Sequence, residues 1–147
     1  VLSTDSELIA RTCLSSGVKI LCRPTELAGD EVASVPVFRH LVEHYPCDLH
    51  VNYNCNFPEC PIDVVEKAIQ IACENGEALS VPYAVWAQTR ERISNYGDPL
   101  EITATRFEDE RIHPLDVHQM EDLLEVHRTH QTELPEEWRS CIGEKKE

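Results

Sequence analysis

The feature that most constrains the fold is a stretch of strict alternation at residues 49–57. Successive side chains of a β-strand point to opposite faces, so this pattern predicts a strand with one buried face and one polar face. Asparagine is a poor strand former, so the prediction depends on pattern and not on propensity. The predicted buried face holds Leu49, Val51, Tyr53, Cys55 and Phe57, and the polar face holds His50, Asn52, Asn54 and Asn56.

Helical spacing of apolar residues flanks this strand on both sides. Before it, apolar residues at 38, 41, 42 and 45 follow Ser34, which is placed to act as an N-cap. After it, an apolar stripe over 61–75 ends at Asn75-Gly76, a typical helix stop. Further helices are predicted over 8–13, 83–93 and 116–127, and further strands over 18–22 and 100–104. Asp116 is predicted to cap the last of these helices, whose apolar residues are predicted to face inward. The order predicts an α/β (α+β) fold, a small mixed sheet flanked by helices.

The length and charge of the chain narrow its organisation and its partners. A chain of 147 residues fits one domain. Since no linker divides it, we predict a single domain over 1–130 and an acidic tail over 131–147. The net charge of −14 repels nucleic-acid phosphates and anionic lipid, and no apolar run approaches the length of a membrane span. We therefore expect partners other than nucleic acid or membrane.

The cysteines indicate a compartment. There are seven of them, an odd number at irregular spacing, which differs from a secreted disulfide framework. Several lie inside apolar patterns, where a reduced cysteine behaves as a small apolar residue. We expect a reducing location, the cytoplasm or the nucleus.

Four stretches carry a resemblance to a known family. They are Val18-Lys19-Ile20-Leu21, residues 35–43 with Phe38-Arg39-His40-Leu41-Val42-Glu43, residues 51–57 followed by Pro58 and Pro61, and residues 62–74. In order and apolar pattern this chain resembles the BTB/POZ superfamily, in its branch of elongin C and F-box adaptors. A fainter likeness lies at 115–126, whereas 77–107 has no counterpart in the family.

The resemblance implies a BTB/POZ-like domain that binds other proteins. It implies an adaptor that forms homo- or hetero-oligomers or links a partner to a larger complex, such as a cullin-type ubiquitin ligase. Because the sequence contains no recognisable catalytic set and no glycine-rich phosphate loop, we expect no enzymatic activity and no cofactor.

Two alternatives follow from the cysteines and histidines. Zinc takes four nitrogen or sulfur ligands, usually as close pairs, and His44 with Cys47 and Cys55 with Cys60 supply two such pairs. His50 lies near them but has the opposite parity to Cys55, so a straight strand does not direct both at one ion. The alternative is a zinc-stabilised intracellular binding domain. A thiol enzyme is the other alternative, although no local signature surrounds any cysteine.

Large aromatic residues are the candidates for contacting a partner. Such residues are enriched where interfaces bind most tightly, which singles out Tyr83, Trp86 and Trp138. Trp86 also suits a core position on a helix. One helical turn would bring Leu134 beside Trp138, either as an anchor for another protein or packed back on the same domain. The predicted partner-binding residues are Tyr83, Trp86, Leu134 and Trp138.

Overall fold

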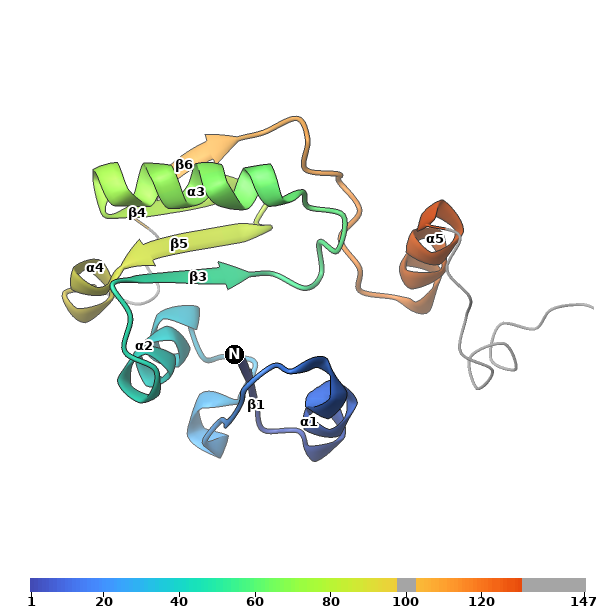
Figure 1. Ribbon diagram of the computed structural model, residues 1–147, viewed down its shortest axis with the longest axis horizontal. Coiled ribbons are helices and arrows are strands. Elements are labelled where there is room, and N and C mark those ends of the chain that lie inside the picture. The colour runs from blue at the N-terminus through green and yellow to red at the C-terminus, as the bar shows by residue number, and fades with distance from the viewer. Residues whose placement is uncertain (98–102, 131–147) are drawn as a thin grey trace, which may run out of the picture.

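The computed structural model describes residues 1–97 and 103–130, and these form a mixed α/β structure (Figure 1). The predicted fold class is therefore confirmed. The strands are β1 (Leu2–Thr4), β2 (Ile20–Cys22), β3 (Leu49–Tyr53), β4 (Glu77–Val81), β5 (Val85–Thr89) and β6 (Thr105–Glu108). The helices are α1 (Glu7–Cys13), α2 (Ser34–His44), α3 (Ile62–Asn75), α4 (Arg90–Ser94) and α5 (Met120–His130), with 3-10 turns η1 (Leu14–Ser16) and η2 (Thr25–Leu27).

Two sheets are present in the described residues. The main sheet has the order β3-β5-β4-β6, with β5 antiparallel to both of its neighbours and β6 parallel to β4. The second sheet is a ribbon of two parallel strands, β1 and β2, with Ser3 opposite Leu21. Strand β3 forms one edge of the main sheet, and the ribbon lies on the side of the molecule where β3 and α2 are found (Figure 1).

Helices cover both faces of the main sheet, and this explains a wrong prediction. The face beneath α3 carries Ala78, Val85 and Ala87 against Val64, Ala68 and Ala72. The other face carries Leu79 and Trp86 against Val35, Phe38 and Val42 of α2 and Ile93 of α4. The even-numbered residues of β3 were predicted to form a polar face opposite the buried one. Instead, the His50 ring packs at 4.6 Å from the Phe38 ring, because α2 covers that side.

Strand β3 ends earlier than the alternation predicts. It stops at Tyr53, and the side chain of Asn54 then accepts a hydrogen bond from the Asn56 backbone N–H at 3.1 Å. Such a local bond replaces the ladder of a strand. Phe57 is still buried, but Cys55, which was predicted to be buried, is exposed. The alternating sequence pattern thus continues to residue 57, whereas the strand itself ends at Tyr53.

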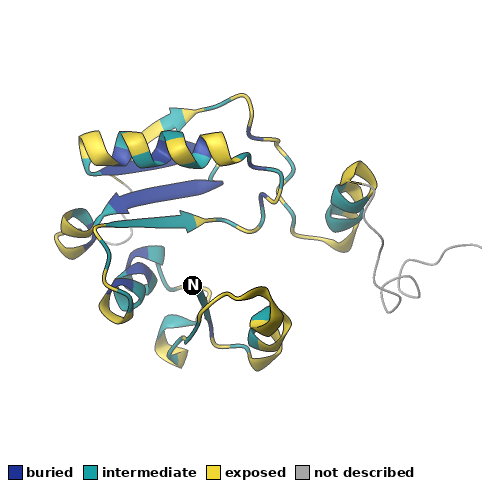
Figure 2. Cartoon of the chain, in the orientation of Figure 1, coloured by how far each residue is buried: buried dark blue, intermediate teal, exposed yellow. Residues whose placement is uncertain are grey.

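The helix predicted over 83–93 is wrong. Residues 85–89 form β5, and only the short α4 follows. Figure 2 shows β4 and β5 as the most buried strands. Residues buried on both faces read as a continuous apolar run, and such a run also fits a buried helix. The Ser80 hydroxyl closes the β4–β5 connection, since it accepts the N–H groups of Ala84 and Val85 at 3.0 and 2.9 Å.

The remaining helices follow the sequence with shifts at their ends. α3 agrees with its prediction and ends at Gly76, whose φ is 84°. α2 begins one residue earlier than predicted, with Ala33 and not Ser34 at the N-cap. Strand β6 lies after the predicted strand 100–104, of which 100–102 fall outside the described residues.

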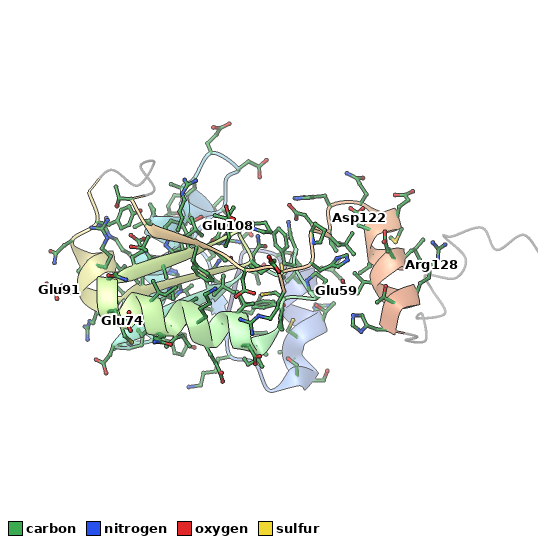
Figure 3. All side chains as sticks on the ribbon, turned by 90° about the horizontal axis from the view of Figure 1, so that it is seen from above. Glu59, Glu74, Glu91, Glu108, Asp122 and Arg128 are labelled. Carbon is green, nitrogen blue, oxygen red and sulfur yellow. The ribbon has the colours of Figure 1, made fainter. Side chains whose placement is uncertain are left out.

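Helix α5 lies at the periphery and packs loosely. It was predicted to face inward, but it contains no buried residue, and Met120 is exposed. The predicted cap, Asp116, is replaced by Asp122, which accepts the N–H groups of His118 and Gln119 at 2.9 Å. Glu59 is placed between the main body and α5 (Figure 3), and its carboxylate lies 3.0 Å from the His130 imidazole.

The short helix predicted over 8–13 is present as α1, but its apolar side is exposed, including Leu8 at 73%. The predicted tail over 131–147, with Leu134 and Trp138, lies outside the described residues. Within 1–97 and 103–130, no helix combines the length and the hydrophobicity needed to cross a membrane.

Candidate functional site

A groove of about 450 Å³ runs along the outer side of β3, and we call it the edge groove. All five residues of β3 line it, from Leu49 to Tyr53. Its opposite wall comes from the last turns of α2 and the residues after it, and from the first residue of the described chain. Those lining residues are Leu41, Val42, Tyr45, Cys47 and Val1.

The backbone of β3 has free hydrogen-bonding groups on the groove side. In an antiparallel pair, only alternate residues exchange hydrogen bonds with the partner strand. The bonds from Arg90 N–H to Asp48 O and from Asn54 N–H to Ala84 O show that the even-numbered residues face β5. The N–H and C=O groups of Leu49, Val51 and Tyr53 therefore point outward. No strand pairs with that side of β3 in the part of the chain described.

The side chains of the edge groove are mainly apolar, with a few polar groups. Burial lowers the pKa of His50 to about 4, so its imidazole is neutral at pH 7, and its Nδ1 is buried without a hydrogen-bond partner among the described residues. The Asn52 amide donates to the Tyr83 hydroxyl at 2.7 Å. The Tyr53 hydroxyl donates to the Phe57 carbonyl at 2.7 Å, and burial raises its pKa. The polar groups of β3 are thus held in fixed positions.

A second groove of about 370 Å³ continues from the first, and we call it the ribbon groove. Both grooves are lined by Leu41, Asn52, Tyr53 and Val1, so they meet at the carboxyl end of β3. The ribbon groove is bounded further by the β1–β2 ribbon and by the segment between η2 and α2. Those additional lining residues include Ser3, Arg23, Leu27, Gly29, Val32 and Ser34.

The charges around the two grooves differ from those of the whole chain. The chain carries 27 acidic and 13 basic side chains, yet none of the described residues that line either groove is Asp or Glu. Arg23 lines the ribbon groove. Lys19 lies 5.4 Å from the centre of the Tyr45 ring, which lines the edge groove. Each groove therefore has a cation in it or beside it.

A buried polar network on the α2 face fixes the strands next to β3. The Glu77 carboxylate is almost fully buried and accepts hydrogen bonds from Trp86 Nε1 at 2.8 Å, Gln88 Nε2 at 2.6 Å and Arg92 Nε at 3.0 Å. The guanidinium of Arg92 also contacts Thr103 and lies over the Tyr96 ring at 4.7 Å. Each carboxylate oxygen has a donor, which favours a structural role over catalysis.

A second ionic cluster ties the segment after β6 to α3. The Asp109 carboxylate pairs with Arg111 at 2.8 Å and with Lys67 at 2.9 Å. Hydrogen bonds from Arg111 and then Lys67 hold the pKa of Asp109 well below its usual range. Arg111 also pairs with Asp63 near the start of α3 at 3.1 Å. Because each charge has a partner, this cluster also has a structural role.

The aromatic residues predicted to bind a partner lie in different environments. Trp86 is 2% exposed, and its indole N–H is used inside the Glu77 network, so it belongs to the core. Tyr83 is half-buried and lines the ribbon groove. Of the two residues, Tyr83 lines one of the two grooves described and Trp86 lines neither. Leu134 and Trp138 lie outside the described residues.

The residues of the alternative zinc site lie in different environments. Cys60 packs in the core beneath α3, whereas Cys47 packs against the core on the α2 side. Cys55 is exposed, and His44 Nδ1 is 2.8 Å from the His40 carbonyl. Within 1–97 and 103–130, no group of three or more His, Cys, Asp or Glu residues is placed to hold a metal ion. The described residues thus offer the zinc alternative no ready site.

Sequence reasoning missed the edge groove. The alternation located β3, but it carried no information on which strands would pair with it. The only signal in the sequence was the predicted strand itself. Any strand that lies at the edge of a sheet exposes the N–H and C=O groups of alternate residues, whatever its side chains are.

No protein-family model matches the chain, and no curated protein matches it. The resemblance to the BTB/POZ superfamily therefore stays a prediction.

Proposed function

We propose that this chain binds an extended segment of another protein, which adds as a fifth strand to the free edge of β3. The carrying observation is that Leu49, Val51 and Tyr53, whose backbone groups point away from β5, all line the edge groove. Peptide recognition by strand addition uses main-chain hydrogen bonds for affinity and neighbouring pockets for specificity. We thus propose the same protein-binding role that the sequence predicted, but the partner contacts β3 and not Trp86.

The chemistry of the groove indicates the occupant. Alternate side chains of an added strand would point toward α2, where Leu41, Val42 and Tyr45 form an apolar wall. The occupant is thus an extended peptide with apolar residues at alternate positions. The basic side chains Arg23 and Lys19 beside an otherwise acidic protein favour a peptide that is not itself basic.

The affinity expected of such a segment is moderate. Three outward residues offer up to six backbone hydrogen bonds, each worth about 1 kcal/mol net. Burial of two or three apolar side chains adds about 1.5–3 kcal/mol each. Ordering an extended peptide offsets much of this gain. We expect Kd values of roughly 10–100 μM.

The test uses a fluorescein-labelled library of nonapeptides with Val, Ile, Leu or Phe at alternate positions. Binding is measured by fluorescence anisotropy against the wild-type chain and against Val51→Pro. Proline at an edge position whose N–H faces outward removes one docking bond and leaves the β5 ladder intact. We expect Val51→Pro to weaken binding at least tenfold while urea denaturation shows a folded protein.

Asn52→Pro is the matched control. Its N–H faces β5, so this variant should lose stability, whereas Val51→Pro should retain most of it. A second measurement does not depend on any variant of the chain. The tightest peptide is N-methylated either at its odd-numbered or at its even-numbered amides, and methylation should abolish binding in one of these two sets and leave it unchanged in the other. No binding from the library, or equal effects in both parities, would contradict strand addition.

A further inference from the structure

The β1–β2 ribbon directs three polar side chains to one face. In paired strands, opposite residues have side chains on the same side, and the side alternates along each strand. Ser3 pairs with Leu21, and the Arg23 N–H bonds the Thr4 carbonyl at 2.9 Å, which places Asp5 beside Arg23. Ser3, Asp5 and Arg23 therefore share one face of the ribbon. Ser3 and Arg23 line the ribbon groove.

These two side chains have hydrogen-bonding atoms without partners. Ser3 Oγ and Arg23 Nε are both buried, and neither has a hydrogen-bond partner among the described residues. Buried polar groups in native proteins are nearly always paired, so each exception calls for an explanation. The two atoms belong to residues that line one groove, and both can donate to a carboxylate.

Asp5 forms an ion pair with Arg23 but gives its Nε no hydrogen bond. The Asp5 carboxylate lies 3.7 Å from Arg23 Nη2, which is too long for a hydrogen bond, and about half of its side-chain surface is exposed. About a quarter of the Arg23 side chain is exposed, whereas its Nε is buried, so a carboxylate in the groove would pair with Nε after a small turn of this side chain. A guanidinium binds a carboxylate best through two parallel N–H bonds, and Nε supplies one of them.

We propose that the segment bound along β3 carries an acidic side chain, which Arg23 and Ser3 hold in the ribbon groove. This inference rests on the proposed strand addition. The two grooves meet at Tyr53, so the acidic residue follows the end of the paired stretch on the Tyr53 side. The occupant is a peptide with alternating apolar residues and one flanking glutamate.

The test compares peptides that differ only in the flanking residue. The tightest nonapeptide is synthesised with Glu or Gln at its amino-terminal flank, and with Glu or Gln at its carboxyl-terminal flank, always as the C-terminal amide. We expect the wild-type chain to prefer Glu over Gln by about tenfold at one flank. The flank that shows the preference gives the direction of the added strand. A gain on replacing the amide by a free carboxylate, with no effect of Glu, would instead assign the site to a peptide terminus and overturn the proposal.

Variants of the chain identify the residue responsible. Arg23→Gln should abolish the preference for Glu, and Arg23→Lys should retain part of it, since lysine keeps the charge but not the paired N–H groups. Arg11→Gln is the matched control, because Arg11 lines neither groove and is largely exposed. Asp5→Asn should strengthen binding of the Glu peptide two- to threefold, because it removes a nearby like charge.

The possible failures are distinguishable. Equal binding of Glu and Gln peptides to the wild-type chain, with Val51→Pro still blocking both, would overturn the acidic site and leave strand addition intact. An undiminished preference for Glu in Arg23→Gln would also overturn the assignment to Arg23. If no peptide binds the wild-type chain, strand addition itself would be contradicted.

Discussion

The buried carboxylate of Glu77 gives the sharpest prediction of stability. We consider Glu77→Leu, which replaces the carboxylate by an apolar side chain of similar size. The change removes the acceptor of three hydrogen bonds, from Trp86, Gln88 and Arg92. All three donors stay in place without a partner, and the first two lie on residues with almost no exposed surface.

The magnitude follows from how deeply each donor is buried. A buried neutral donor without a partner costs about 1–3 kcal/mol, and two such donors are created. Arg92 is one-third exposed on its side chain, so water compensates much of its loss. The added leucine buries apolar surface, which offsets about 1–2 kcal/mol. With the middle of each range, the net loss in the free energy of unfolding is about 2–3 kcal/mol.

Urea denaturation followed by tryptophan fluorescence measures this loss. Trp86 is in contact with the changed residue, so its emission reports the same region. Glu91→Leu is the matched control, because Glu91 lies on the surface of α4 (Figure 3) and should change stability by less than about 0.5 kcal/mol. A loss below about 0.5 kcal/mol for Glu77→Leu would refute the view that this network holds β4, β5 and α4 together.

Two further predictions concern single residues. The pKa of His50 is about 4 in the folded chain and near 6.5 when unfolded, so the unfolded state binds more protons between these values and stability falls as pH falls from 6.5 to 4. This loss should reach about 3 kcal/mol and should be absent in His50→Asn, as measured by urea denaturation across this pH range; parallel curves for both proteins would contradict the burial of His50. Gly76→Ala should cost about 1–2 kcal/mol because φ is 84° there, although the added Cβ would meet only Thr89 Oγ1 at 4.0 Å. Gly29→Ala, at a residue with ordinary φ, should change thermal stability little, and equal losses at the two sites would contradict this reasoning.

The sequence predicted elements with a single, long apolar face better than elements buried on all sides. α2 and α3 each present one apolar stripe, and both were found near their predicted ends. β5 is buried on both faces, so its side chains show no period of two, and the spacing of Tyr83, Trp86 and Ala87 fitted a helix equally well. The local pattern could not distinguish a buried strand from a helix here, because the burial of both faces of β5 results from the helices that pack on the sheet.

The site was less predictable than the fold for a related reason. The outward groups of β3 are backbone atoms, which every residue has, so composition does not mark them. Their availability depends on the strand order β3-β5-β4-β6, which is set by contacts far apart in the sequence. The position of the Arg23 Nε, which has no hydrogen-bond partner among the described residues, likewise depends on the pairing of residues 2–4 with 20–22.

The open side of β3 also bears on how copies of this protein behave together. An unpaired strand edge is a template for any other strand, including the β3 of a second molecule. Each copy carries a net charge of −14, so two copies repel one another as they approach. This mutual repulsion is weakened by salt, so the same edge that receives a partner in dilute buffer becomes a route to self-association at high ionic strength.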